Sequence, residues 1–289
     1  MPTKIEKDEI SGHDTTGHEW DGIKELNTPL PKWWVYMFYA SIVFAIGYAI
    51  LYPSIPSFNS HSAGTLGYSQ RQVVAERLAE IQELKAPMFK RIAAASLDQI
   101  RGDGELLNFS LAGGRVIFGD NCATCHGAGG AGAKGFPNLA DDDWLWGGAL
   151  KDIHRTISFG VRNANDNARQ SQMPRFGADG LLTPAQINDT AEYVLAMTKR
   201  ETDKVAARRG EKIYAEQCVA CHGEKGQGNT ELGAKRLNNN IWLYGGDKAT
   251  LVTSITGARG GSMPAWSERF DDVTIKMLAI YVHALGGDQ

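Results

Sequence analysis

The motif Cys122-Ala123-Thr124-Cys125-His126 recurs as Cys218-Val219-Ala220-Cys221-His222, and the two copies use all four cysteines of the chain. This spacing is typical of covalent attachment of c-type haem, in which each cysteine forms a thioether to a haem vinyl group. The following histidine then supplies one axial ligand to the iron. Because residues three and four apart share one face of a helix, both thioethers and the imidazole address the same porphyrin. The two motifs therefore predict a protein that carries electrons.

Two disulfides or a zinc site are the other uses of four cysteines. Two cysteine pairs supply enough ligands for zinc, but zinc does not require a histidine directly after each second cysteine. Disulfides do not require the Cys-x-x-Cys spacing. Haem attachment needs reduced thiols, haem and an exported chain together, so we expect the haem-binding part to lie outside the cytoplasm.

Length and charge limit the remaining possibilities. A chain of 289 residues allows roughly two domains of common size. The formal net charge is −3, and no basic run is present, which argues against a nucleic-acid partner.

One segment, Trp33 to Tyr52, has no charged residue and is about as long as a helix that crosses a bilayer. Aromatic residues gather at both of its ends, as in the aromatic belts at headgroup depth, and Pro53 and Pro56 then stop the helix. A cleaved signal peptide is the alternative, but it begins nearer the N-terminus and ends in a small-residue cleavage site. We therefore expect a retained anchor.

The orientation of this anchor follows from its flanks. Four lysines precede it, whereas no Lys or Arg occurs between Trp33 and Gln70. The positive-inside rule counts Lys and Arg, so it favours a cytoplasmic N-terminus and a periplasmic C-terminal part.

A connector follows the anchor. Ser69 with Gln72 predicts a capping box, and apolar residues then recur at helical spacing. We expect Pro87 to end this helix and a second helical piece to run from Met88 to about Ile100, before the break Gly102-Asp103-Gly104. The connector is an amphipathic spacer or a surface that packs on a partner.

From about Phe109 the chain repeats itself. Trp144-Leu145-Trp146-Gly147-Gly148 is echoed by Trp242-Leu243-Tyr244-Gly245-Gly246, and Gly160-Val161-Arg162 by Gly257-Ala258-Arg259. Each repeat closes with a helix, and Thr183 with Pro184 marks the start of the first one. The predicted segments are an N-terminal segment at 1–32, a transmembrane helix at 33–52, a connector at 53–108, and cytochrome c domains at 109–200 and 205–287.

Each repeat also has one Met-Pro pair, at Met173 and Met263. A thioether sulfur is a soft sixth ligand that raises the reduction potential of haem iron relative to a second histidine. A core methionine that fills a gap is the alternative, but both repeats place Met-Pro at the corresponding point. From the residues alone, each methionine is expected to ligate the haem of its own repeat.

Several other residues are candidates for supporting roles. Arg162 and Arg259 are candidates for hydrogen bonds to haem propionates, with solvated surface arginines as the alternative. The Pro137 carbonyl is a candidate acceptor for the His126 ring N–H, and the second repeat has no proline at the matching place. The run Asp141-Asp142-Asp143 is expected to be a solvated loop, or to help steer a basic donor.

With the anchor at Trp33-Trp34, both Cys-x-x-Cys-His motifs and both Met-Pro motifs, the chain closely resembles the CcoP/FixP family, the dihaem cytochrome c subunits of cbb3-type cytochrome c oxidases. The resemblance covers nearly the whole chain. It implies a mainly α protein with one N-terminal transmembrane helix, a helical connector and two tandem class I cytochrome c domains related by a pseudo-twofold axis. It also implies that the domains exchange their methionines. Met263 with His126 would then ligate the haem on Cys122 and Cys125, and Met173 with His222 the haem on Cys218 and Cys221.

The function implied is electron transfer, with no bond chemistry in this chain. The two covalent haems c would accept electrons from a soluble or membrane-bound cytochrome c. They would pass them to a monohaem cytochrome c subunit and then to the catalytic subunit, which reduces O₂ at haem b and copper. The expected place is the bacterial inner membrane, with haem domains in the periplasm. The alternatives are a free-standing membrane-anchored dihaem shuttle and a dihaem peroxidase, which needs an open iron.

Overall fold

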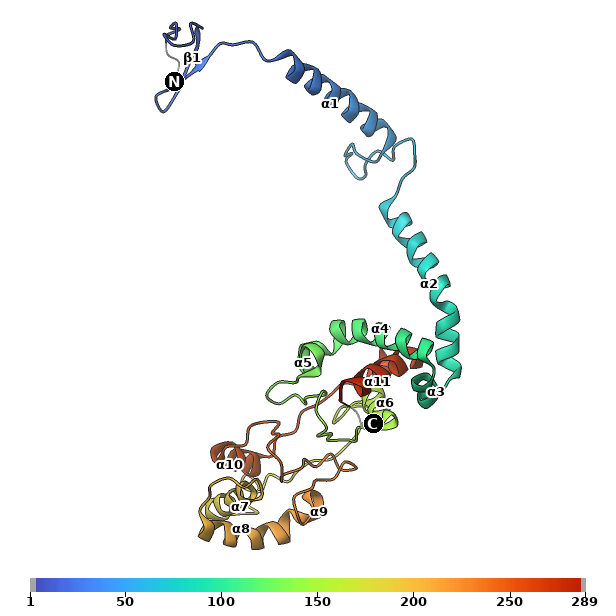
Figure 1. Cartoon of the computed structure of the whole chain (residues 1–289), viewed down its shortest axis with the longest axis vertical. Coiled ribbons are helices and arrows are strands. Elements are labelled where there is room, and N and C mark those ends of the chain that lie inside the picture. Colours follow the sequence, from blue (N-terminus) through green and yellow to red (C-terminus); the bar gives the residue numbers. More distant parts are fainter. Residues whose placement is uncertain (1–3, 287–289) are drawn as a thin grey trace. The chain divides into compact units, whose positions relative to one another are not determined.

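The computed structural model describes residues 4–286, and the chain is mainly helical, as predicted (Figure 1). It divides between Glu83 and Leu84 into two units, which are described separately here.

The first unit begins with a small antiparallel hairpin of β1 (Thr15–Trp20) and β2 (Ile23–Leu26). The connection is the pair Asp21-Gly22, whose φ angles of 49° and 85° are both in the left-handed region. A two-residue turn with positive φ at both positions matches the right-handed twist of the strands, and Asp-Gly is one of its preferred sequences. The sequence analysis did not predict this hairpin.

Helix α1 (Lys32–Leu51) follows, and its bounds agree with the predicted span 33–52 within one residue at each end. It is 20 residues long, and none of its side chains is buried within the protein. At about 1.5 Å per residue it is about 30 Å long, which matches the hydrocarbon thickness of a bilayer. By length and composition, α1 therefore suits a membrane span.

Helix α2 (Gln70–Ala94) begins after Ser69 as predicted, and the backbone N–H of Gln72 donates to Ser69 Oγ at 3.4 Å. The predicted capping box is incomplete, because the Gln72 side chain donates to Glu76 Oε1 instead. The prediction that Pro87 ends this helix is wrong, because the helix continues through it to Ala94. A proline inside a helix removes one donor and leaves the carbonyl four residues earlier without its usual partner. Beyond the proline, Phe89 and the fully buried Ile92 pack into a core, and this packing favours the helical course.

The second unit contains the repeats. Asp103 separates two helices at the predicted break and caps the second, accepting from the backbone N–H groups of Glu105 and Leu106. Thr183 begins its helix as predicted, with Pro184 in the first turn, and it also forms a capping box with Gln186. The elements are α3 (Leu97–Gly102), α4 (Gly104–Asn121), α5 (Ala123–His126), η1 (Ala128–Gly130), α6 (Leu150–Phe159), α7 (Pro184–Met197), α8 (Lys204–Gln217), α9 (Val219–His222), α10 (Lys248–Gly257), η2 (Trp266–Glu268) and α11 (Asp272–Gly286).

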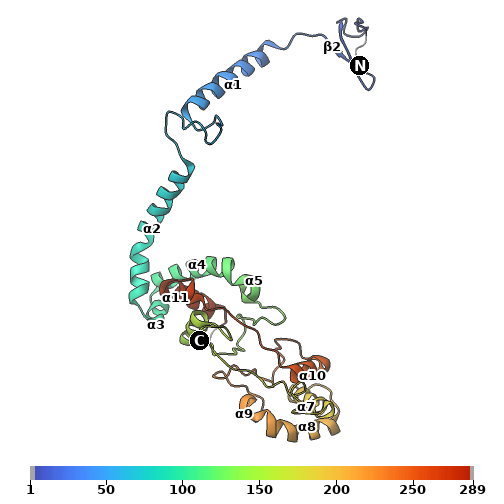
Figure 2. The ribbon, with the colours of Figure 1, turned by 180° about the vertical axis from the view of Figure 1, so that it is seen from behind.

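The packing of these helices crosses the repeats. Helix α4, which opens the first repeat, packs on α11, which closes the second, and the two lie side by side in both views (Figures 1 and 2). Helix α8, which opens the second repeat, packs on α7, which closes the first. One core accordingly combines Phe118 with Leu278 and Val282, and the other combines Ile187 with Tyr214. Each core is built from both repeats, and the limits 109–200 and 205–287 stay a prediction.

The crossing of α4 and α11 depends on a glycine, which gives a test. We expect Gly114→Ala to lower the free energy of unfolding by about 1–3 kcal/mol, the usual effect of overpacking. The reason is that a Cβ at this position would lie 2.5 Å from the Met277 carbonyl oxygen and 2.7 Å from Tyr281 Cβ.

Gly119→Ala on the same helix is the matched control, since nothing lies within 4 Å of its Cβ position. Replacing glycine by alanine in a helix is expected to stabilise the protein by about 0.5–1 kcal/mol. Denaturant unfolding of the full chain in detergent measures both. Equal effects of the two substitutions would contradict the close crossing.

Candidate haem sites

Each Cys-x-x-Cys-His motif lies in a short helical turn directly after a long helix. Helix α4 leads through Cys122 into α5, and α8 leads through Cys218 into α9. The backbone N–H of His126 donates to the Cys122 carbonyl, and that of His222 donates to the Cys218 carbonyl, both at 2.9 Å. The same backbone turn thus presents both motifs. We call their surroundings the first site (Cys122, Cys125, His126) and the second site (Cys218, Cys221, His222).

The four cysteines, all among the described residues, form no disulfide with one another. Cys125 and Cys221 are exposed, whereas burial raises the pKa of the Cys122 and Cys218 thiols to about 11. Within residues 4–286, no three His, Cys, Asp or Glu side chains come together as a metal-ligand group, so the two cysteine pairs do not converge on a zinc site. Each pair serves its own site.

A backbone carbonyl orients each histidine ring. His126 Nδ1 lies 3.0 Å from the Pro137 carbonyl oxygen, which confirms the predicted contact. In the second site the Lys235 carbonyl takes this role, 2.9 Å from His222 Nδ1. With Nδ1–H donating to a carbonyl, the lone pair of Nε2 is available for a metal ion. Burial lowers the pKa of His222, which favours the neutral ring that a metal needs.

The first site opens into a cavity of about 540 Å³, within the range of pockets that hold small molecules and cofactors. Cys122, Cys125 and His126 line this cavity together with Met263 and Pro264 of the second repeat. Most of its wall is apolar and excludes water; it includes Phe118, Trp144, Ile153, Ile157, Leu278 and Val282.

Backbone hydrogen bonds hold Met263 in this place. Val161 N–H donates to the Met263 carbonyl at 3.0 Å, and Met263 N–H donates to the Val161 carbonyl at 2.9 Å. Asn163 Nδ2 donates to the same Met263 carbonyl at 2.7 Å. The Met-Pro segment of the second repeat is therefore fixed to the backbone of the first repeat.

The second site shows the reciprocal arrangement. Met173 of the first repeat packs against the same core as Cys218, Val219 and Trp242 of the second. Met263 thus lines one cavity with the motif of the first repeat, and Met173 shares a hydrophobic core with part of the motif of the second.

The two predicted propionate arginines are not equivalent. Arg162 lines the cavity of the first site, where its Nε donates to the Gly261 carbonyl at 2.8 Å, and burial lowers its pKa. Arg259 lies over the Tyr244 ring, 5.0 Å from its centroid, and donates to the Thr250 carbonyl.

The structural counterpart of Arg259 is Arg169, which the sequence analysis missed. Arg169 lies over the Trp146 ring at 5.4 Å, and its Nη2 lies 3.3 Å from the Asp152 carbonyl oxygen. Trp146 and Asp152 correspond to Tyr244 and Thr250 when the echoed Trp-Leu segments are aligned. A signal was present, because Arg169 and Arg259 each stand four residues before the methionine of a Met-Pro pair.

Unpaired buried donors test whether an anionic cofactor fits. Trp144 Nε1 donates to the Gly286 carbonyl at 2.9 Å, but Trp242 Nε1, at the matching position, is buried without a partner among the described residues. Arg259 Nε is buried and unpaired in the same sense. Both are donors, so the carboxylates of a haem suit them. The cavity, the oriented imidazoles and the soft methionine sulfurs also fit haem.

Comparison with known proteins covers nearly the whole chain. Residues 12–59 match the family described as the N-terminal domain of cytochrome oxidase-cbb3, FixP. Residues 111–198 match cytochrome c, and residues 205–282 match cytochrome C oxidase, cbb3-type, subunit III. A cbb3-type cytochrome c oxidase subunit CcoP of Azospirillum brasilense is 52% identical over 289 residues, with 98% of each chain covered. The chain belongs to the CcoP/FixP family of cbb3-type cytochrome c oxidase subunits.

Other relatives agree. A subunit FixP of Bradyrhizobium sp. (strain ORS 278) is 53% identical with 99% of each chain covered, and a subunit CcoP of Cereibacter sphaeroides is 45% identical with 100% of each chain covered. The two cytochrome c matches confirm the tandem organisation predicted from the repeats. Membership in this family means that the chain carries covalently bound haem c.

The buried position of Arg169 gives a second test. Its side chain is 7% exposed and pairs with Asp152 at 3.2 Å, and its Nε donates to Thr156 Oγ1. We expect Arg169→Gln to lower the free energy of unfolding of the haem-loaded chain by about 1–3 kcal/mol, because buried partners lose their hydrogen bonds.

Arg175→Gln is the control, since Arg175 makes an exposed ion pair with Asp179, four residues away in a loop. Exposed ion pairs contribute at most about 1 kcal/mol. Thermal unfolding monitored by circular dichroism compares the two variants. A larger loss of stability for Arg175→Gln than for Arg169→Gln would show that the buried contacts of Arg169 do not stabilise the fold around the first site.

Proposed function

We propose that this chain is the membrane-anchored, dihaem electron-transfer subunit of a cbb3-type terminal oxidase. The observation that carries the proposal is the presence of two sites of one design. Each has a Cys-x-x-Cys-His turn, a carbonyl that orients the imidazole, and a methionine from the other repeat close by. Such sites suit two covalent haems c, each of which supplies a one-electron Fe(III)/Fe(II) couple when bound.

In the proposed ligation, His126 and Met263 bind the iron of the first site, and His222 and Met173 that of the second. The shared cavity supports the first pair, and the common core supports the second. Two strong protein ligands per iron leave no position for peroxide, so this arrangement favours an electron relay over a peroxidase.

The protein's part in electron transfer is to hold these ligands still. The carbonyls of Pro137 and Lys235 fix the imidazole rings, and the Val161 backbone fixes Met263. The apolar wall keeps water away, so little reorganisation accompanies a change of iron charge. Leu243 and Tyr244 of the second repeat also line the first cavity, so both repeats build its wall.

The finer assignments of place and partner rest on the anchor and the family. Helix α1 and the oxidase-subunit relatives fit an inner-membrane protein. The lysines before α1 favour a cytoplasmic N-terminus with the haem sites in the periplasm. We propose a cytochrome c as donor, and a monohaem cytochrome c subunit and the haem b and copper subunit as partners. Arg162, Arg169 and Arg259 are proposed to contact propionates.

Purification tests the assignment to an oxidase. Isolated from its membrane in mild detergent, the chain is expected to bring with it subunits that contain haem b and copper, measured by pyridine haemochrome spectra and metal analysis. Recovery of the dihaem chain alone, still able to reduce several acceptors, would instead support a free-standing shuttle.

Ligand substitution tests the exchange of methionines. In a Cys122→Ala/Cys125→Ala background only the second site keeps covalent haem. There we expect Met173→His to lower the reduction potential of the remaining haem, because a second imidazole stabilises the ferric state relative to a thioether.

Met263→His in the same background is the matched control and should leave that potential nearly unchanged. Redox titration followed at the haem α band measures both variants. A shift caused by Met263→His instead would mean that each methionine serves its own repeat. In the intact chain, the two substitutions should shift different haems.

A further inference from the structure

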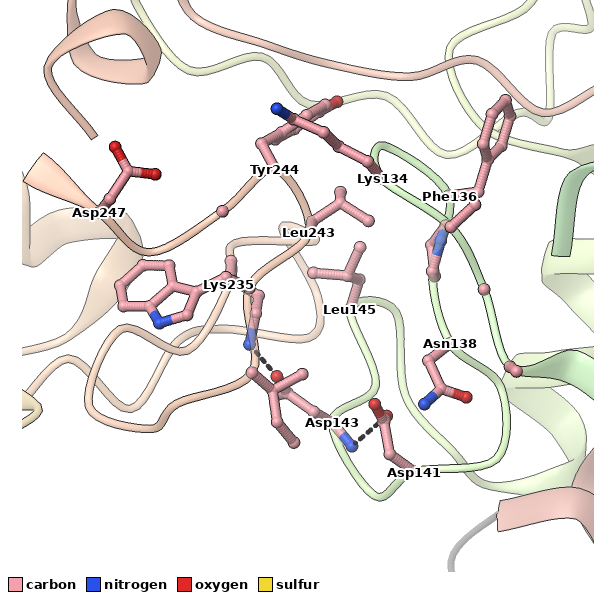
Figure 3. A pocket seen from close by; sticks show the side chains of 17 residues that line it. Lys134, Phe136, Asn138, Asp141, Asp143, Leu145, Lys235, Leu243, Tyr244 and Asp247 are labelled. Atoms are coloured by element: carbon pink, nitrogen blue, oxygen red, sulfur yellow. Dashed lines mark hydrogen bonds and ion pairs between the residues drawn. The ribbon is translucent and has the colours of Figure 1, made fainter. Parts of the chain in front are cut away.

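One ion pair connects the two repeats in the interior of the second unit. Lys235 Nζ pairs with a carboxylate oxygen of Asp143, and the two side chains are only 17% and 8% exposed. Figure 3 shows them at the wall of a second cavity of about 500 Å³, which is lined by loops of both repeats and shares lining residues with the cavity of the first site. The acidic run at 141–143 is therefore not a fully solvated loop, because its last carboxylate is buried.

Lys235 is also the residue that orients His222. Its backbone carbonyl accepts from His222 Nδ1, while its ammonium group reaches Asp143 in the first repeat. A single residue thus joins the axial imidazole of the second site to a charge of the other repeat. Asn239 Oδ1, 3.4 Å away, is a weaker partner of the ammonium.

Asp143 is equally well held. Its backbone N–H donates to Asp141 Oδ1 at 3.1 Å. The next residue, Trp144, packs in the core of the first site and donates to the Gly286 carbonyl. The Asp143 carboxylate is therefore held in place by the first repeat and pairs with Lys235 of the second.

The first site has no counterpart of this pair. Aligning Trp144 with Trp242 places Pro137 opposite Lys235 and Ile241 opposite Asp143. Neither Pro137 nor Ile241 carries a charge, although both line the same cavity. The two imidazoles are held alike, but of their two carbonyl partners only Lys235 also forms an ion pair with the other repeat.

We propose that the Lys235–Asp143 pair is a positioning and charge-setting device that makes the two haem sites inequivalent. The inference rests on the proposed dihaem function. A buried ammonium beside the second site stabilises the iron in its less positive, ferrous state, because little solvent screens the interaction. Asp143 opposes this effect from the first repeat, so the potential of the second site depends on a residue outside its own repeat.

The sign of the shifts tests the proposal. Lys235→Met leaves an unbalanced carboxylate and should lower the potential of the second haem. Asp143→Asn removes the carboxylate that pairs with the ammonium, leaves Asp141 as the remaining acidic neighbour, and should raise that potential. We expect about a tenfold change in the reduction equilibrium constant in each case, equivalent to about 59 mV for one electron. The double variant should return close to the parent value. The measurement is a redox titration of the haem-loaded full chain at pH 6.

Two controls remove exposed charges: Asp142→Asn beside the pair and Lys212→Met on α8. Both should leave the potential of the second haem nearly unchanged. A purely structural role predicts shifts of the same sign for both single variants of the pair, and that result, or no shift, overturns the proposal.

A charge-swapped pair, Lys235→Glu with Asp143→Lys, keeps the test valid if a single variant fails to fold. It retains the ion pair but puts the negative charge beside His222, so the potential should fall; an unchanged potential overturns the proposal. Haem content measured alongside distinguishes a failure of the proposed dihaem function from a failure of the proposed role of the pair. Fewer than two haems in the unsubstituted chain contradicts the dihaem function itself. Two haems per chain with unchanged potentials in the variants contradict only the role of the pair.

Discussion

The constraint on which the second unit depends is the packing of helices across the repeats, α4 on α11 and α8 on α7. Each opening helix ends in a Cys-x-x-Cys-His turn, so the helix that supports the turn comes from the other repeat. With this crossing, Met263 lines the cavity of the first motif, and Met173 packs on the core that also includes Cys218. Neither repeat has a complete core or a complete site without the other, which explains why they form one compact unit.

Features set by neighbouring residues were predictable from sequence. The bounds of α1, the cap at Thr183 and the break at Asp103 depend on side chains within a few positions. The His126–Pro137 contact was predictable for a similar reason, since it spans one loop. The Asp21-Gly22 hairpin carried a local signal as well, in a turn pair between two short strands, and it was missed.

Features that depend on distant contacts were not accessible in this way. Pro87 predicts a helix end, but core packing around Ile92 carries α2 onward. The burial of Asp143 requires Lys235 of the other repeat, and nothing near Asp143 in sequence announces that partner. Arg162 was aligned with Arg259 because both follow a glycine. The equivalent residue is Arg169, which lies seven positions after Arg162 in the first repeat. Like Arg259, it stands four residues before the methionine of its own repeat.

The crossed packing also sets the order in which the sites are completed when the chain is synthesised from its N-terminus to its C-terminus. The buried core residues of the second site lie between Phe176 and Ile255 and form one continuous stretch. Those of the first site begin at Phe118 but also require Trp266 and α11. The site that is encoded first is therefore finished second. As the chain is synthesised, the first motif therefore stays without its final core until α11 arrives, by which time the core of the second site is already complete.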